Sequence, residues 1–189
     1  MVVLLLLGFL GVRFTLGHLQ ESYVDSLVQN KVTEFQSYID GSSQSGLRQA
    51  ALLSRNPAVV AAYETALGGN VDDPKSPEAQ QAREAIREAF VPLIKGFEAS
   101  LGKKPRVHFH LPNGRSLVRL WREKQAKRNG KWVDISDDLT SFRQTVMDVN
   151  GDSKPRFGIE AGRGGFTIRG LAPVVSDAGK HLGSVEVLH

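Results

Sequence analysis

The sequence of 189 residues contains no cysteine. Disulfide bonds and thiolate metal sites are therefore excluded, whereas the cellular compartment stays open, because proteins without cysteine occur in many compartments. The sequence also lacks a Walker phosphate loop, a Gly-x-Ser-x-Gly nucleophile elbow and a His-Glu-x-x-His metal motif. No catalytic constellation is recognisable, so we predict neither an enzymatic activity nor a cofactor for this chain.

The composition is that of an ordinary globular protein. Hydrophobic residues make up 41% of the chain and charged residues 23%, so a proper core can form. The net charge of +4 indicates contact with anions, but it does not choose among nucleic acid, lipid headgroups and small acids. The length suits one domain, with or without a helical extension.

The longest apolar run lies at the amino terminus, where residues 1–12 carry no charged side chain and Arg13 follows. A membrane-spanning helix needs about 20 apolar residues, and the run approaches that length only when it is counted through Gly17. A signal-peptide core and a buried core helix are the alternatives. No basic segment precedes the run and no clear cleavage site follows it, which disfavours the signal peptide. We predict that residues 1–17 are a transmembrane or signal-anchor segment, truncated at its start.

Helical spacing follows directly on this run. Apolar side chains recur at three- and four-residue steps, with charged residues between them, at Leu19, Tyr23, Leu27, Val28, Val32, Phe35 and Ile39. We predict one long helix over residues 18–55, with a weak point at the glycine- and serine-rich residues 41–46. This helix either packs against the rest of the chain or forms a dimer seam that transmits movement.

Two proline-led starts predict further helices after the long one. Asn56 and Ser76 are suitable N-cap residues, and Pro57 and Pro77 each suit a first helical position. Pro92 predicts a kink or an early end in the second of these helices, because proline removes a helical hydrogen bond.

The sequence then changes to short β-type runs. We predict a helix over residues 137–149 and five strands, at residues 105–111, 115–121, 155–161, 166–175 and 181–188. Helices that come first and antiparallel strands that come later define the α+β class.

The first two predicted strands concentrate the side chains with binding chemistry. An Asn-Gly pair predicts a type I′ turn between them. His108 and His110 alternate with apolar residues and so share one face, and Arg119 shares a face with Trp121. An arginine among apolar residues is costly to bury unless an anion meets it. This hairpin is therefore the first candidate for a ligand site.

His108 and His110 are also possible metal ligands. A metal site needs three or four ligands, and no further histidine motif or carboxylate cluster accompanies the pair in the sequence, where His181 is remote. We predict a histidine that hydrogen-bonds a ligand, with a structural or exposed role as the alternative, and no metal site.

Four arginines lie among apolar residues, namely Arg119, Arg143, Arg163 and Arg169. A planar guanidinium holds a carboxylate through two parallel hydrogen bonds, so these residues could bind an organic acid. The alternatives are a surface position or an internal ion pair with Asp137, Asp138 or Glu160. We expect at least one of the arginines to contact a ligand.

The densest basic segment is residues 122–131. It contains no aromatic residue, so it offers no platform on which nucleic-acid bases could stack. We predict a solvated loop here and no binding of nucleic acid.

Six short motifs, in this order, resemble the double Cache sensor domains that bacterial chemoreceptors and sensor histidine kinases carry outside the membrane. They are residues 108–112, 116–121, 137–143, 158–160, 169–174 and 181–186. The ordered set is more specific than any one motif. The apolar run and the long helix that precede them match the layout of that family as well.

The resemblance implies a PAS-like antiparallel sheet on a long helix that emerges from the membrane. Residues 18–189 would form one Cache-type sensor domain, with a long helix at 18–55, helices at 57–100 and a β-rich ligand-binding module at 105–189. By their place in the motifs, the ligand-binding candidates are His110, Arg119, Trp121, Arg143 and Arg169, while Glu160 and Glu186 could pair with arginines instead. A double Cache domain has two such modules, whereas this sequence contains one. We therefore expect the carboxyl end to be truncated.

The function implied is that of an extracytoplasmic ligand-sensing domain of a bacterial transmembrane receptor, either a chemotaxis receptor or a sensor histidine kinase. The domain would bind a small anion, such as a carboxylate or an amino acid, and lie in the periplasm as a homodimer anchored in the inner membrane. A kinase domain could follow in the full-length protein. The alternatives are a membrane-anchored metal-dependent hydrolase using His108 and His110, and a structural or partner-binding module without a ligand.

Overall fold

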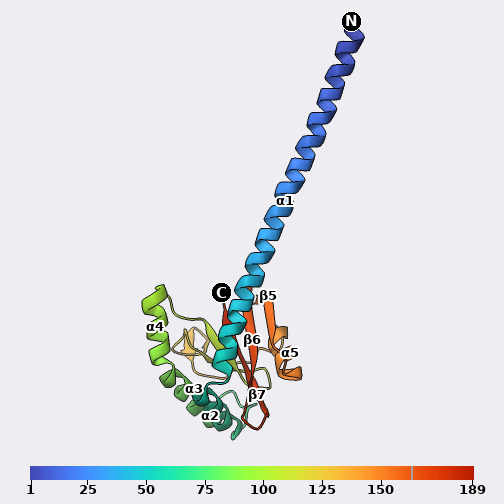
Figure 1. The fold of residues 1–189 in the computed structure, drawn as a ribbon. Helices are drawn as coiled ribbons and strands as arrows, with labels where there is room; N and C mark the ends of the chain where they lie inside the picture. Colours follow the sequence, from blue (N-terminus) through green and yellow to red (C-terminus); the bar gives the residue numbers. More distant parts are fainter. Residues whose placement is uncertain (163) are drawn as a thin grey trace. The chain divides into compact units, whose positions relative to one another are not determined.

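The structure is a computed structural model that describes residues 1–162 and 164–189 (Figure 1). The chain divides into two compact units, Met1–Asp40 and Gly41–His189. One helix, α1 (Val2–Ser54), supplies nearly all of the first unit and continues into the second. Arg163, one of the four arginines singled out from the sequence, lies outside the described residues.

Among the described residues, α1 is the one helix long and apolar enough to cross a membrane. An 18-residue window near its amino end has a mean hydropathy of 2.0, and none of that window is buried. This finding rests on length and composition, which membrane anchors and signal sequences share. It is consistent with the predicted membrane segment.

Three helices follow, α2 (Pro57–Leu67), α3 (Pro77–Ala89) and α4 (Val91–Leu101), and the first two begin at the predicted caps. The Asn56 side chain accepts a hydrogen bond from the N–H of Ala58 at 2.9 Å, and the Ser76 hydroxyl accepts one from the N–H of Ala79 at 3.3 Å. Pro92 lies in the first turn of α4, where a missing N–H costs nothing. The predicted early end is therefore confirmed as a break between α3 and α4.

The carboxyl half forms a five-stranded antiparallel sheet with the strand order β2-β1-β7-β6-β5. Its strands are β1 (Val107–His110), β2 (Ser116–Arg119), β5 (Arg156–Gly162), β6 (Gly165–Val175) and β7 (His181–Leu188). The predicted α+β class is therefore confirmed.

The two faces of the sheet differ in character. Helices α2 and α3 contact β7 and β2, whereas α5 (Gln144–Asp152) contacts β5, β6 and β7, so the sheet lies between them (Figure 1). On the first face Phe109 packs edge-on against Tyr63 and Phe90, with ring centroids 6.4 and 5.8 Å apart. This face carries the main apolar core. The apolar cluster on the α5 side is much smaller, which leaves that face to polar side chains.

Within the second unit, α1 approaches the sheet at a pair of glycines. A Cβ atom added to Gly170 on β6 would lie 1.9 Å from the backbone nitrogen of Leu47. A Cβ added to Gly46 would lie 3.0 Å from the nitrogen of Gly170 and from the carbonyl oxygen of Val187. Residues 41–46 lie within α1 and do not break it, although the sequence predicts a weak point there.

We predict that Gly170→Ala lowers the free energy of unfolding by about 1–3 kcal/mol, because the added methyl group forces the helix away from β6. Urea unfolding of the purified chain, followed by circular dichroism, measures the change. Gly96→Ala is the matched control: Gly96 lies inside α4 with no atom within 4 Å of the added Cβ. It should leave the stability unchanged or raise it by up to about 1 kcal/mol. Equal effects of the two substitutions would contradict the close contact.

The predicted helix over residues 137–149 is wrong in its first half, because α5 begins only at Gln144. The preceding backbone pairs with the β1–β2 hairpin instead. The N–H of Ser116 donates to the carbonyl oxygen of Asp137 at 2.9 Å, and the N–H of Leu139 donates to that of Gly114 at 3.2 Å. These tertiary hydrogen bonds outweigh the helical pattern of the sequence.

The turn between β1 and β2 differs from the predicted type I′ form. Gly114 has a φ of 79°, but Asn113 does not share the positive φ that a type I′ turn requires. Pro112 fixes a negative φ at the first turn position, which favours a type I turn followed by a left-handed glycine.

The basic run at residues 122–131 is not an open loop. Its second half enters a two-stranded hairpin of β3 (Ala126–Arg128) and β4 (Lys131–Val133). Gln125 and Ala126 are buried at its base, whereas Lys127 and Arg128 are exposed. The run therefore combines a solvated tip with a base that packs inward.

Candidate functional site

A group of buried polar side chains covers the sheet face on which α5 lies. We call it the polar cluster, and its members are His108, His110, Ser116, Arg119, Gln125, Asp137, Arg143, Glu160, Arg169, Ser184 and Glu186. All of them are buried except Glu160, whose side chain is 13% exposed. The strand register creates the group, because His108 lies opposite Arg119 on β2 and opposite Glu186 on β7. Residues directly opposite each other point to the same face of a sheet.

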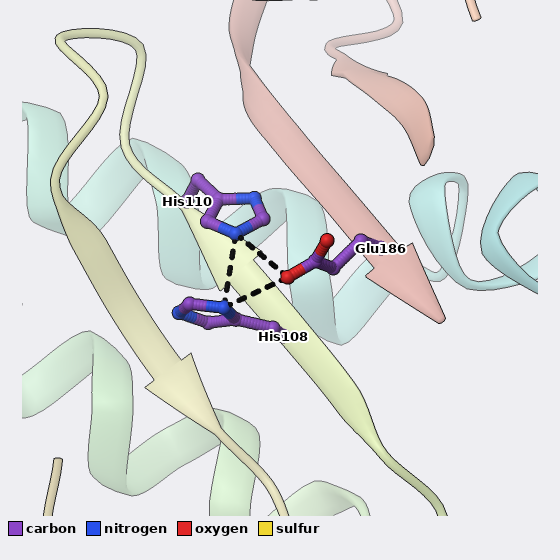
Figure 2. A group of neighbouring side chains, drawn as sticks. All are labelled: His108, His110 and Glu186. Carbon is purple, nitrogen blue, oxygen red and sulfur yellow. Dashed lines mark hydrogen bonds and ion pairs between the residues drawn. The ribbon is translucent and has the colours of Figure 1, made fainter. Parts of the chain in front are cut away.

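Figure 2 shows the centre of the polar cluster, where His108, His110 and Glu186 point toward one another. His108 Nδ1 lies 3.0 Å from Glu186 Oε1, and His110 Nε2 lies 3.0 Å from His108 Nδ1 and 3.4 Å from Glu186 Oε1. These three residues form the one group of the described chain that has the ligand types and the closeness of a metal site.

Serine side chains hold the outer nitrogens of both imidazoles. His108 Nε2 lies 2.8 Å from the hydroxyl of Ser116, and His110 Nδ1 lies 3.3 Å from the hydroxyl of Ser184. Ser116 also donates to the side-chain oxygen of Gln125 at 3.2 Å. These contacts fix the orientation of both rings.

The Glu186 carboxylate joins the histidines to two arginines. Arg143 donates to both of its oxygens, and Arg169 Nη1 lies 3.3 Å from Glu186 Oε2. Glu160 is a second partner of the same arginines: its Oε2 lies 2.9 Å from Arg143 Nε and 3.2 Å from Arg169 Nη1. One central carboxylate therefore links β1, β6, β7 and the start of α5.

Arg119 forms a separate ion pair beside this centre. It holds both oxygens of Asp137, at 2.8 and 3.2 Å, and it donates to the carbonyl oxygen of Gln125 at 2.9 Å. This pair explains why the chain near Asp137 leaves the helical path predicted for it.

The charges of the polar cluster balance. Burial by itself would raise the pKa of the Glu186 carboxyl, but Arg143 and the two histidines together hold that pKa well below its usual range. Burial lowers the pKa of His108 and of His110, so both imidazoles are neutral at pH 7. The three described guanidiniums of the cluster thus face three carboxylates, and their formal charges cancel.

Trp121 connects the polar cluster to an open cavity. Its indole meets the His108 ring edge-on, with centroids 5.9 Å apart. The cavity has a volume of about 480 Å³ and is lined by Trp121, Arg122, Glu123, Lys124 and Trp132. The Arg122 guanidinium lies 5.7 Å from the Trp121 ring and 5.3 Å from the Trp132 ring, within the range of cation–π attraction. The lining therefore combines two indoles with two cations and one carboxylate.

Four of the five ligand-binding residues predicted from the sequence lie in the polar cluster: His110, Arg119, Arg143 and Arg169. The fifth, Trp121, lies at its rim. The internal ion pairs that the sequence offered as an alternative for the arginines are also present, since Asp137 pairs with Arg119, and Glu160 pairs with Arg143 and Arg169. The structure therefore brings the candidates together, and its arginines there pair with carboxylates of the protein.

Sequence reasoning missed the polar partners of the histidines. Ser116, Ser184 and Gln125 carry no local signal, and Gln125 lies in the run that was expected to be a solvated loop. Glu186 was considered only as an arginine partner, because it stands 78 residues after His108. The alternation of polar and apolar residues in β7 was the one signal that could have placed it on the histidine face.

The chain thus forms a domain of the α+β class with a buried polar cluster on one face of an antiparallel sheet. The chain belongs to the double Cache family described as the double sensory domain of two-component sensor kinases, which matches residues 28–188. The resemblance to double Cache domains is therefore confirmed, and the domain is a sensory module rather than a catalytic one. No curated protein matches the chain significantly.

Two solved structures are similar in fold. The sensor domain of Escherichia coli DcuS has 10% sequence identity and a TM-score of 0.47, with 79% of this chain and 89% of that chain covered. The sensor domain of the Vibrio cholerae histidine kinase DctB has 13% identity and a TM-score of 0.45, with 85% of this chain and 56% of that chain covered. Both likenesses are low, so the family assignment rests on the sequence match.

We predict that Glu186→Gln lowers the free energy of unfolding by about 3–5 kcal/mol, because it leaves two buried guanidiniums without their shared carboxylate. Chemical unfolding in the presence of a chelator measures the loss. Asp152→Asn removes a carboxylate that pairs with Arg156 at the surface, and it should leave the stability unchanged within error. A loss for Glu186→Gln no larger than that of this control would show that the buried carboxylate does not hold the cluster together.

Proposed function

We propose that the chain is the extracytoplasmic sensing domain of a bacterial membrane receptor and that its polar cluster binds a small organic anion. The start of α1 would anchor it in the inner membrane, with the sheet in the periplasm. The observation that carries the proposal is the convergence of three buried guanidiniums on one face of a sheet, in a domain of a sensory family. Such cations can exchange a protein carboxylate for a ligand carboxylate.

Among the three described guanidiniums of the polar cluster, Arg169 has the weakest contacts with protein carboxylates. Arg119 and Arg143 each hold one carboxylate through both terminal nitrogens. Arg169 reaches Glu160 and Glu186 through Nη1 alone, at 3.2 and 3.3 Å, and burial lowers its pKa. A ligand carboxylate that binds Arg169 bidentately would gain the most, because it would complete the pairing of that cation.

Binding at this position would rearrange ion pairs that join several elements. An anion on Arg169 competes with Glu160 on β5 and Glu186 on β7, and the ligand shifts the equilibrium only if it binds one arrangement better than the other. Arg169 precedes Gly170, whose backbone touches α1 near Gly46. A change in β6 can therefore reach α1, which would carry it toward the membrane as a small helix displacement.

A sensor histidine kinase is the output that we propose for the whole protein. The family description names two-component sensor kinases and not chemotaxis receptors. In such a receptor the sensory domain controls a kinase that lies on the other side of the membrane.

Calorimetric titration of the full chain in detergent micelles against mono- and dicarboxylates and amino acids tests the ligand proposal. We expect at least one acid to bind. Arg169→Gln should weaken that acid by about tenfold or more, because a hydrogen-bonded charge contributes about 1.5–3 kcal/mol.

The exposed Arg128 on β3 supplies the control, since its guanidinium donates only to the neighbouring Lys127 carbonyl oxygen among the contacts described. Arg128→Gln should leave the affinity unchanged. Equal losses in both variants would point to a general effect of net charge. Binding by none of the acids would favour the alternative that the polar cluster is purely structural, which its balanced charges permit.

We also propose that α1 pairs with α1 of a second copy of the chain. Val28, Val32, Phe35 and Ile39 follow one another at steps of four, three and four residues, which is the spacing of a coiled-coil seam. The first three are 52%, 44% and 62% exposed within the Met1–Asp40 unit. Two copies of the same stripe complement each other about a twofold axis, so a second chain is the partner that fits.

The absence of cysteine allows a direct test, because a single introduced thiol is unique in the chain. Val32→Cys should form a disulfide-linked dimer under mild oxidation, since facing seam positions come within disulfide reach. Asn30→Cys lies away from the seam on the same helix and should remain mostly monomeric. Non-reducing electrophoresis compares the two, and equal cross-linking at both positions would contradict the seam.

A further inference from the structure

Three ligand-type atoms at the centre of the polar cluster form a nearly equilateral triangle. The sides between His108 Nδ1, His110 Nε2 and Glu186 Oε1 are 3.0, 3.0 and 3.4 Å long (Figure 2). A tetrahedral zinc ion with bonds of about 2.0–2.1 Å separates neighbouring ligand atoms by about 3.3 Å. The triangle therefore has the size of one face of a tetrahedral metal site.

One arrangement of the surrounding hydrogen bonds leaves Nδ1 of His108 without a proton. The backbone N–H of Arg119 donates to Gln125 Oε1 at 2.9 Å, so that atom is an acceptor. The hydroxyl of Ser116 donates to the same oxygen at 3.2 Å, which uses the hydroxyl proton. In that arrangement Ser116 accepts from His108 Nε2, 2.8 Å away. A neutral His108 then has a lone pair on Nδ1.

This lone pair faces a carboxylate. Glu186 is ionised beside Arg143 and Arg169, and an ionised carboxylate only accepts hydrogen bonds. A proton on His110 Nε2 can be donated to Nδ1 of His108 or to Oε1 of Glu186. Neither choice places a proton between Nδ1 and Oε1, which lie 3.0 Å apart. A cation inside the triangle would satisfy all three atoms at once.

We propose that His108 Nδ1, His110 Nε2 and Glu186 Oε1 bind a divalent transition-metal ion of the zinc type. Each ligand is held from behind, as metal ligands usually are, because Ser116 and Ser184 contact the outer histidine nitrogens and Arg143 holds the carboxylate. Two imidazoles with one carboxylate suit zinc and similar ions better than magnesium or calcium, which prefer oxygen ligands.

A bound metal would change the charge of the polar cluster. Because its arginines and carboxylates cancel, a divalent ion adds two uncompensated positive charges. Three protein ligands also leave the fourth tetrahedral position open. An organic acid next to Arg169 could place an oxygen there and offset the charge. This last step rests on the proposed anion binding, whereas the metal site itself does not.

A proton on His108 Nδ1 is the competing occupant of the triangle, since it would let Nδ1 donate to Glu186. A neutral His108 carries that proton when Ser116 donates to Nε2 instead. A metal ion and a proton in the triangle can be distinguished, because only the metal ion is detected by metal analysis of the purified protein.

Metal analysis of the full chain in detergent micelles tests the site with no organic acid present. Protein stripped with a chelator and then dialysed against a low concentration of Zn²⁺ should retain one ion per chain. Co²⁺ should give the visible absorption of a tetrahedral site in the wild-type chain, a measurement that does not depend on any variant folding. A chain that retains no stoichiometric metal and gives no such absorption overturns the proposal, whether or not acids bind in calorimetry.

Variants then locate the ion. His110→Ala should weaken Zn²⁺ binding by more than about 100-fold, and Ser116→Ala by about 10–100-fold, the loss typical of a group that orients a metal ligand. His181→Ala is the matched control, because His181 is a half-buried histidine held by Ser153 and Asn150 outside the polar cluster. It should bind Zn²⁺ as the wild type does. Undiminished binding by folded His110→Ala, or an equal loss in His181→Ala, would contradict the assignment.

Discussion

The compensation of one buried charge, that of Glu186, determines how the polar half of the domain is built. This carboxylate lies at the middle of a sheet and is fully buried, so its charge must be met by hydrogen-bond donors and cations. Two histidines from β1, Arg143 before α5 and Arg169 from β6 meet it. Removing any one of them unbalances the others. The apolar face, which is packed from aromatic and aliphatic side chains, has no comparable constraint.

The same constraint makes the polar cluster suited to sensing. When the charges of a buried group cancel, the entry of one anion or one metal ion leaves the group with a net charge. Its members come from β1, β2, β5, β6 and β7, from the loop before β3 and from the segment before α5, so a change of partners acts on several elements together. The contact between Gly170 and α1 lies one residue from Arg169, which gives such a change a short route to the helix. Membership of a sensory family and an apolar first helix agree with this role.

The parts of the fold that depend on local sequence could be predicted. Alternation placed His108 and His110 on one strand face, and the Asn56 and Ser76 caps located two helix starts. The parts that depend on distant partners could not. The segment at Asp137 has a helical pattern, yet it is extended because the β1–β2 hairpin and Arg119 bind it. The same limit applies to the cluster, whose central carboxylate joins the histidines only through the pairing of β1 with β7.

The central claim is that the polar cluster is a binding site and not only a charged core. A high-resolution crystal structure of the chain, grown with Zn²⁺ and with an acid that shifts its melting temperature, tests it most directly. We expect an anomalous scatterer inside the triangle of His108, His110 and Glu186, and density for the acid in contact with Arg169. Density for both groups elsewhere, with the ion pairs of the polar cluster unchanged, would contradict the claim.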